Sequence, residues 1–398
     1  MSGSAALLKI VRFGMIRVVP GLFNFALIPW LLVTLGPAAY GVYSTWLGYA
    51  ALVANTVAAI VTQPMFRYLP HRPEERELFT GFALVAALAA AALSGGIFLH
   101  LGVSTSFALG FAAFSFGTVL GSSVGVDFVL SQRVMRLASF EALRILSILV
   151  VLALPLLRGL PLRTEDVVLG LAVSNLLPIL LLAGRPRLAL PSREWLVRTL
   201  SYGAKSAAWL MMAGLPMVSA KTILMQAMPE HAFGAYTAVA DLTYRGFALA
   251  NAALMMWAFP LLSAQFDAGE VAETRRTLRF TLLVYTGLGA TAVAVLLGGI
   301  NLFRIDAAAL PGGMIGVALI TLASFGWHGM SIAHKPFEMT QRTTQMAALM
   351  ALGVAGFYAS TFGLIRLAGF EAFYVVILSL IAVALVYGGI GLSQKLER

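Results

Sequence analysis

The chain has 398 residues, of which 60% are hydrophobic and only 11% charged, and its mean hydropathy is +0.89. A soluble domain carries about 25% charged residues, so this composition excludes a soluble globular protein and indicates one that crosses a membrane several times. The net charge of +10 does not indicate nucleic-acid binding, because no basic domain lies outside the apolar stretches. The absence of cysteine excludes disulfides and thiolate metal sites.

Apolar stretches of about 20 residues recur from end to end, and each is long enough to cross a hydrocarbon core roughly 30 Å thick. Period-two alternation is absent, which favours helices over a barrel. We expect the first helix to be retained rather than cleaved as a signal peptide. The sequence predicts an all-α polytopic membrane protein with twelve spans, at residues 13–35, 41–66, 79–101, 106–130, 142–159, 166–184, 203–228, 233–262, 279–302, 310–333, 345–366 and 370–393.

Lysine and arginine concentrate in alternate loops. Twenty of the 27 fall in one set of loops and four in the other. Because cationic residues gather in cytoplasmic loops, this bias predicts that both termini are cytoplasmic. The other three cations, Arg17, Lys221 and Arg245, fall inside predicted spans.

The longest predicted loop is basic and runs from Arg185 to Lys205. Its second part, from Arg193 to Lys205, is interpreted as an amphipathic surface helix that joins two halves, although a plain linker fits equally well. A boundary near residue 190 predicts an N-terminal six-helix bundle at 1–190 and a C-terminal six-helix bundle at 191–398.

Short motifs recur between these halves. Gly41-Val42-Tyr43 returns 193 residues later as Gly234-Ala235-Tyr236, and Gln132-Arg133 after the fourth span returns as Gln341-Arg342 after the tenth. Six spans in each half make the repeat a parallel one, related by a pseudo-two-fold axis along the membrane normal. Such a pair of bundles is expected to enclose a cavity and to work by alternating access.

The stretch from Leu35 to Trp46 is predicted to be a tight interfacial turn on the outer face. In this interpretation Pro37 and Gly41 break the helices, and the aromatic residues anchor at headgroup level; these are Tyr40, Tyr43 and Trp46. We expect the stretch to mark the repeat and to form part of a gate, rather than to hold substrate charge.

The Leu-Gly-x-x-x-Tyr-Gly-x-Tyr turn, its echo Glu230-x-x-Phe-Gly-x-Tyr and the two Gln-Arg loops resemble those of the Wzx-type polysaccharide flippases. These belong to the multidrug/oligosaccharidyl-lipid/polysaccharide exporter superfamily, and the resemblance covers essentially the whole chain in topology. It implies movement of undecaprenyl-diphosphate-linked oligosaccharide from the cytoplasmic to the periplasmic leaflet of a bacterial inner membrane, for a surface polysaccharide such as O-antigen. The implied partners are that lipid-linked substrate, a coupling proton or sodium ion, and polysaccharide polymerases.

Four cations are candidate substrate-binding residues, namely Arg17, Lys205, Lys221 and Arg245. Arg17 and Lys205 start the first and seventh spans at matched positions, where they could hold a diphosphate together. Lys221 lies sixteen residues after Lys205, which is about 24 Å along a helix, and is a candidate second stop on an anionic path. The alternatives are snorkelling for Arg17 and Lys221 and ordinary positive-inside bias for Lys205.

Two acids are candidates for coupling or for ion pairs. Asp241 and Arg245 are spaced i, i+4 in the eighth span, which predicts an ion pair on one helix face. Alternatively, a proton on Asp241 would release Arg245 to bind substrate. Asp127 lies at the end of the fourth span, where the helix dipole disfavours an anion, so a structural partner such as Arg133 or another loop arginine is expected.

Other chemistry finds little support in the sequence. The five histidines form no i, i+4 ligand pair, so no metal site is predicted, and no phosphate loop or other cofactor motif is present. A cation-coupled drug exporter of the same superfamily is the main alternative, but it favours buried carboxylates, which are few. A membrane polysaccharide polymerase or ligase is a second alternative, but no outer loop gathers acids, histidines or a nucleophile, and we therefore predict no enzyme.

Overall fold

The computed structural model describes the backbone of residues 3–183, 189, 191–300, 303–369 and 371–396, and the side chains of these residues except 3–15, 17, 18, 256 and 367. Twelve helices of 19 residues or more, one five-residue helix and two short 3-10 helices make up nearly all of this part of the chain. In chain order they are α1 (Gly3–Leu35), α2 (Pro37–Tyr68), η1 (Pro73–Glu75), α3 (Arg76–His100), α4 (Thr105–Leu130), α5 (Val134–Leu157), α6 (Thr164–Leu182), α7 (Arg193–Ala227), α8 (Glu230–Asp267), α9 (Val271–Gly299), η2 (Ala307–Ala309), α10 (Met314–Ala333), α11 (Lys335–Met339), α12 (Thr343–Ala368) and α13 (Ala372–Ser393).

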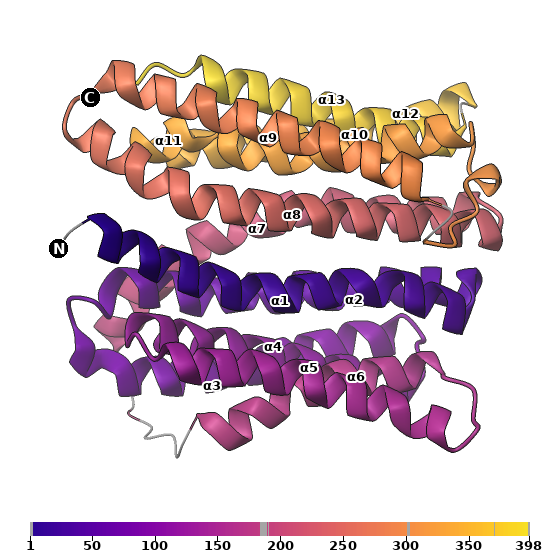
Figure 1. The fold of residues 1–398 in the computed structure, drawn as a ribbon, viewed down its shortest axis with the longest axis horizontal. Coiled ribbons are helices and arrows are strands. Elements are labelled where there is room, and N and C mark those ends of the chain that lie inside the picture. The colour runs from indigo at the N-terminus through magenta and orange to yellow at the C-terminus, as the bar shows by residue number, and fades with distance from the viewer. Residues whose placement is uncertain (1–2, 184–188, 190, 301–302, 370, 397–398) are drawn as a thin grey trace. The chain divides into compact units, whose positions relative to one another are not determined.

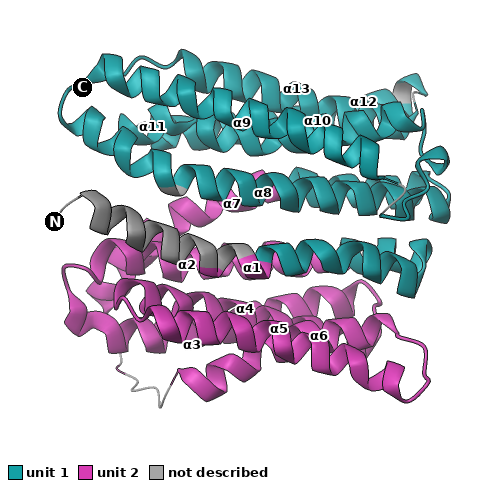
Figure 2. Ribbon diagram, viewed as in Figure 1, with its two compact units in different colours: residues 1–14, 21–45, 215–398 teal, residues 15–20, 46–214 magenta. Residues whose placement is uncertain are grey.

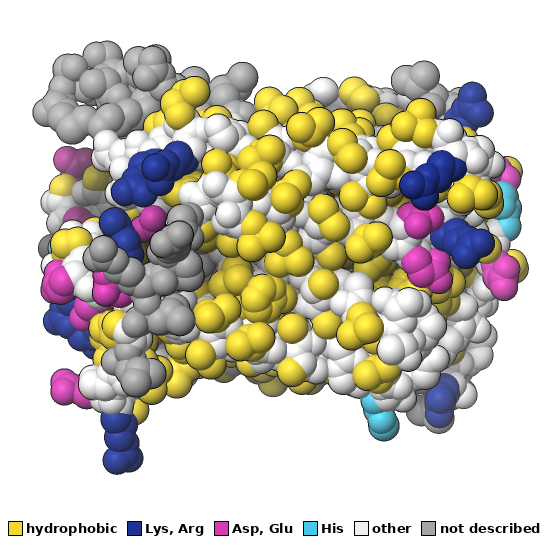
Figure 3. All heavy atoms as spheres, turned by 90° about the horizontal axis from the view of Figure 1, so that it is seen from below, with side chains coloured by type: hydrophobic (Ala, Val, Ile, Leu, Met, Phe, Trp, Pro, Cys, Tyr) yellow, Lys and Arg dark blue, Asp and Glu magenta, His cyan; other side chains and the backbone are white. Residues whose placement is uncertain are grey.

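The length and polarity of these helices make the chain a multi-pass membrane protein. Among the described residues, ten helices are long and apolar enough to cross a membrane, the bent helix α8 is an eleventh, and residues Val19–Leu35 of α1 form a shorter apolar stretch. Figure 3 shows one face of the molecule, with hydrophobic side chains across the middle and charged side chains towards the two ends. Exposed apolar side chains between charged ends are what a lipid-facing surface requires.

The helices fall into two compact units, coloured separately in Figure 2. Unit 1 comprises residues 1–14, 21–45 and 215–398, and unit 2 comprises residues 15–20 and 46–214. Helices α1, α2 and α7 each contribute residues to both units. The units therefore differ from the predicted halves 1–190 and 191–398, which remain a prediction.

Unit 2 is built around α3, α4, α5 and α6. Helix α4 packs on α3, α5 and α6, and α5 packs on α6. Its core includes Val61, Phe79, Ala87, Val119 and Trp195, all at most 5% exposed. The segment from Arg193 to Lys205 is helical as predicted, but it is the first part of the continuous helix α7 rather than a separate surface helix, and its Trp195 is buried in the core.

Unit 1 is built around α8, α9, α10, α12 and α13. Helix α10 packs on α8, α9 and α13, and α12 packs on α13, as Figure 1 allows the reader to follow. Its core includes Phe247, Leu262, Tyr285 and Ile332. The rings of Tyr285 and Phe325 stack at 4.8 Å.

The connection between α1 and α2 is much shorter than the predicted turn. It consists of Gly36 alone, at φ 79°, and Pro37 is the first residue of α2, a position that tolerates proline because its missing N–H has no helical partner. Gly41 does not break the helix. Tyr40 and Tyr43 are 1% and 3% exposed, so the predicted headgroup anchoring is wrong for both.

The two Gly-x-Tyr motifs lie against each other in unit 1. A Cβ on Gly41 would lie 2.8 Å from the Phe233 ring, and a Cβ on Gly234 would lie 2.5 Å from the carbonyl carbon of Pro37. Each glycine therefore permits close approach of α2 and α8, which explains why glycine stands at the same place in both motifs.

The Gln-Arg motifs also have matching local structure. Gln132 and Gln341 adopt φ 55° and 57°, an uncommon region for residues other than glycine. The following arginine N–H donates to the phenylalanine carbonyl five residues earlier at 2.8 Å in each loop, from Arg133 to Phe128 and from Arg342 to Phe337. The motifs that marked a repeat in the sequence thus share one loop conformation.

Candidate functional site

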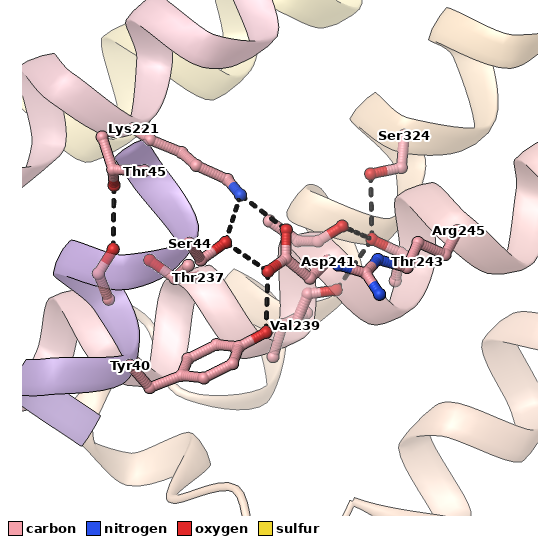
Figure 4. Close-up of polar contacts among 12 residues, drawn as sticks. Tyr40, Ser44, Thr45, Lys221, Thr237, Val239, Asp241, Thr243, Arg245 and Ser324 are labelled. Carbon is pink, nitrogen blue, oxygen red and sulfur yellow. Dashed lines mark hydrogen bonds and ion pairs between the residues drawn. The ribbon is translucent and has the colours of Figure 1, made fainter. Parts of the chain in front are cut away.

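The candidate site is a cluster of four polar side chains in unit 1, which we call the Asp241 cluster (Figure 4). Tyr40 and Ser44 come from α2, Lys221 from α7 and Asp241 from α8. The four-residue spacing of Tyr40 and Ser44 places both on one face of α2. Three helices therefore meet at one carboxylate.

Every described partner of the Asp241 carboxylate donates to it. Lys221 Nζ donates to Oδ1 at 2.5 Å, the Tyr40 hydroxyl donates to Oδ2 at 2.7 Å, and the Ser44 hydroxyl also donates to Oδ2. Lys221 Nζ also donates to Ser44 Oγ at 2.8 Å, so Ser44 links the two charged groups. The residue Asp241 is 8% exposed and the Lys221 side chain 12%, and charges this deeply buried must be paired and hydrogen-bonded.

The cluster lies at membrane depth. Asp241 is eleven residues beyond Glu230, the first residue of α8, which is about 16 Å along the helix axis. Ionised side chains at this depth face a partner or a polar path, because exposure to hydrocarbon is costly. The Lys221–Asp241 pair meets this requirement within the protein.

Arg245 does not form the predicted ion pair with Asp241. Its Nη1 instead donates to the backbone carbonyl of Asn24 in α1 at 3.1 Å. Lys221 pairs with the carboxylate instead, because its flexible stem reaches Asp241 from α7, and the alternative in which Lys221 snorkels is therefore wrong. Lys221, Asp241 and Arg245 together hold one net positive charge.

Further hydroxyls and an amide continue from this region along α8. Thr243 Oγ1 lies 2.9 Å from Ser324 Oγ, and Asn251 donates to Ser331 Oγ at 2.6 Å. Both contacts join α8 to α10. These contacts fix the rotation of α8 about its axis, and therefore the direction in which the Arg245 side chain points from the helix.

The other predicted site residues lie elsewhere. Arg17 belongs to α1, and its side chain is outside the described residues. Lys205 is exposed on α7 in unit 2, and the structure describes no ion pair for it. Asp127 pairs with Arg76 Nε at 2.8 Å in unit 2, which agrees with the expected loop arginine but not with Arg133.

Sequence reasoning missed Tyr40 and Ser44 as site residues. The stretch from Leu35 to Trp46 was predicted to lie at the membrane interface and not to hold substrate charge. In the structure, the hydroxyls of Tyr40 and Ser44 both bind the Asp241 carboxylate. The available signal was their four-residue spacing in an apolar stretch. No group of three or more potential metal-ligating side chains occurs in the part of the chain that the structure describes.

No protein-family model and no curated protein matches this chain. Solved structures do match it. An inward-facing multidrug resistance MATE family transporter of the MOP superfamily is 14% identical, with a TM-score of 0.71 over 96% of this chain and 97% of the other. The outward-facing form scores 0.62 at 14% identity over 96% and 93%, and the eukaryotic MATE transporter AtDTX14 scores 0.66 at 13% identity over 98% and 94%. This chain therefore has the fold of the MATE transporters of the MOP superfamily.

Proposed function

We propose that this protein is a membrane exporter that works by alternating access, and that Arg245 binds an anionic group of its cargo. The observation that supports this most is the balance of charge at membrane depth in unit 1. Asp241 forms its ion pair with Lys221, whereas the described hydrogen bond of Arg245 goes to a backbone carbonyl and its interaction with Asp241 is electrostatic only, without an ion pair. Arg245 is thus a cation with no neutralising carboxylate of its own.

The chemistry of arginine favours a phosphate or carboxylate ligand. The bond to Asn24 uses one of five N–H groups in a planar fork. Such a fork binds phosphate oxygens in pairs. A cargo phosphate would replace a neutral carbonyl with a full negative charge and so bind more strongly.

The proposed cargo is undecaprenyl-diphosphate-linked oligosaccharide, moved from the cytoplasmic to the periplasmic leaflet of a bacterial inner membrane. The motif resemblance to Wzx-type flippases supports this class of cargo. So does the net positive charge of Lys221, Asp241 and Arg245 taken together. Arg17 and Lys205 are proposed as further diphosphate contacts near the cytoplasmic entrance. Both termini would be cytoplasmic, and polysaccharide polymerases would receive the exported units.

Coupling is proposed to act on the Asp241 cluster. A proton or sodium ion arriving at the carboxylate would neutralise it and leave the Lys221 ammonium without its counter-charge. The group released in this way is Lys221, rather than Arg245 as the spacing first indicated. Moving one charge across 100 mV supplies about 2.3 kcal/mol, which would contribute to driving such a rearrangement.

A cation-coupled drug exporter is the second candidate, and the buried Asp241 carboxylate favours it. The similar structures include multidrug transporters, and one of them, the MATE transporter ClbM, is in complex with Rb⁺. In this chain, however, a cationic drug would have to displace the Lys221 ammonium at 2.5 Å. The polymerase or ligase alternative gains no support from the fold, since the similar structures are transporters.

A flipping assay tests the proposal. Purified protein in proteoliposomes receives a fluorescent undecaprenyl-diphosphate sugar, and quenching from outside reports its leaflet. We expect Arg245→Ala to lower the flipping rate at least tenfold, because one charge-assisted hydrogen bond is worth about 1.5–3 kcal/mol. Arg245→Lys keeps the positive charge and should retain part of the wild-type flipping rate.

The matched control is Arg366→Ala, an exposed arginine in the last turn of α12, which we expect to flip at the wild-type rate. Wild-type flipping by Arg245→Ala would overturn the anionic site. If the wild type transports a fluorescent organic cation and leaves the lipid in place, the drug-exporter function holds instead.

A further inference from the structure

The α8–α9 connection in unit 1 has a groove unrelated to the Asp241 cluster. The groove has a volume of about 730 Å³ and is lined by the end of α8 and the first turns of α9. Its basic residues are Arg275, Arg276 and Arg279, and its apolar floor includes Trp257, Phe280 and Leu283. Figure 1 shows this connection at the same end of unit 1 as the end of α13.

The sequence of α9 places these residues on its outer face. Thr274, Leu278 and Thr281 are buried against unit 1, whereas Phe280 and Leu283 are 54% and 70% exposed. The arginines precede Phe280 and Leu283 by about one turn. This face therefore changes from cationic to apolar along the helix axis.

Helix α8 completes the floor. Trp257 is 40% exposed and meets the Phe280 ring edge-to-face at 6.0 Å. Two exposed aromatic rings and a leucine form a surface that water covers poorly and that a hydrocarbon chain covers well.

The groove is electropositive. Its one acid, Glu273, lies 3.8 Å from Arg276, and both side chains are more than half exposed, so this pair is weak. The structure describes no ion pair for Arg275 or Arg279. Three arginines and one glutamate leave a net charge of +2 in a groove with an apolar floor.

We propose that this groove binds one anionic phospholipid, with its phosphate at Arg275 and Arg279 and an acyl chain along Trp257, Phe280 and Leu283. The order of groups matches a lipid at the membrane surface, where phosphates lie directly above hydrocarbon. A soluble phosphate would satisfy the arginines but leave the exposed apolar floor uncovered. The site is separate from cargo binding at Arg245, and its test reads lipid binding rather than transport.

Native mass spectrometry on the delipidated full chain tests the proposal, with phosphatidylglycerol, phosphatidylcholine and inorganic phosphate as probes. We expect the wild type to bind the first phosphatidylglycerol at least tenfold more tightly than phosphatidylcholine. Arg275→Gln with Arg279→Gln should abolish this preference, and Arg275→Lys with Arg279→Lys should retain most of it. Phe280→Ala with Leu283→Ala should weaken both lipids.

The matched control is Arg133→Gln with Arg136→Gln, which removes two exposed arginines from unit 2 and should keep the preference. The proposal is overturned if the glutamine variant at Arg275 and Arg279 retains the preference, or if the control variant loses it equally. Competition by millimolar inorganic phosphate would also overturn it, in favour of a soluble-anion site.

Discussion

One ion pair of unit 1 lies deep within its helices, unlike the described pairs of unit 2. In unit 1, Lys221 and Asp241 pair within long apolar helices, and both side chains are at most 12% exposed. In unit 2, Arg76 pairs with Asp127, and Arg198 with Glu75, near helix ends. The arginines of these pairs are 44% and 30% exposed. These arginines keep part of their hydration, whereas Lys221 and Asp241 are both buried and depend on each other for stabilisation.

This difference indicates distinct roles. The pairs of unit 2 hold segments in place, as when Trp195 Nε1 donates to Glu75 at 2.9 Å and Arg198 lies over the Tyr68 ring at 4.9 Å. A buried pair in a membrane is costly to form and costly to break singly. Retaining one in unit 1 is more consistent with a working site than with anchoring.

The largest expected effect comes from breaking the buried pair on one side. Asp241→Ala should lower the free energy of unfolding by about 3–5 kcal/mol, because it leaves the Lys221 ammonium buried and unpaired. Thermal unfolding in detergent measures this. The double variant Lys221→Met with Asp241→Asn should recover at least half of the loss.

The matched change in unit 2 is Arg76→Gln, which should cost only about 0–1 kcal/mol, because the Arg76–Asp127 pair is partly exposed. Equal losses for Asp241→Ala and Arg76→Gln would remove the distinction between the two units.

A smaller effect is expected from the hydroxyl that supports Asp241. Tyr40→Phe removes the donor at 2.7 Å and should cost about 1.5–3 kcal/mol, as for a hydrogen bond to a charged group. Tyr43→Phe is the control, since Tyr43 is equally buried and the structure describes no hydrogen bond for its hydroxyl. Similar melting temperatures for the two variants would mean that Tyr40 acts by packing alone.

Close-packed glycines are a feature that the units share. Gly234→Ala in unit 1 and Gly203→Ala in unit 2 should each cost about 1–3 kcal/mol, because the new Cβ would meet the backbone of Pro37 at 2.5 Å and of Ile60 at 2.9 Å. Gly96→Ala in α3 meets nothing within 4 Å and should be neutral or stabilising. Melting temperatures that fall for only one unit would show that the packing differs as well.

The smallest effect concerns an exposed pair between the first turn of α8 and the loop before η2. His231 Nε2 lies 3.0 Å from Asp306, and this hydrogen bond holds the pKa of Asp306 below its ordinary value. A lowered carboxyl pKa stabilises the fold above the unfolded value of about 3.9, and this stabilisation is lost as the pH falls through the lowered value. The melting temperature of the wild type should therefore be slightly higher than that of Asp306→Asn at pH 6. At low pH the two melting temperatures should be equal. A difference independent of pH would refute the pair.

Much of the fold could be predicted because it is local. The predicted span 106–130 is α4 at Thr105–Leu130, and 370–393 is α13 at Ala372–Ser393. A run of about 20 apolar residues fixes a spanning helix by itself. The fourth and tenth spans were also followed by matched Gln-Arg loops, whose shared backbone conformation is likewise a local property.

The site was predicted less well, because its contacts are distant in sequence. The i, i+4 spacing correctly singled out Asp241 but indicated Arg245 as its partner. Lys221 lies seven residues before Met228, and Asp241 lies twelve after Pro229. On antiparallel helices that offset is about 7.5 Å along the axis, which the lysine stem spans. Tyr40 was misjudged for the same reason, since its burial depends on the close approach of α2 to α8.

The sequence by itself determined that this protein is a helical, multi-pass membrane protein, and it predicted an internal repeat and cations within the spans. Apolar length, charge bias and short motifs are properties of the chain, so no folding is needed to detect them. Only the tertiary structure decided that Lys221 neutralises Asp241, that Tyr40 and Ser44 serve the same carboxylate, and that Arg245 is left with a backbone carbonyl. The physical reason is that a charge at membrane depth is satisfied by whatever group lies within about 3 Å in space, and sequence spacing alone does not give that distance.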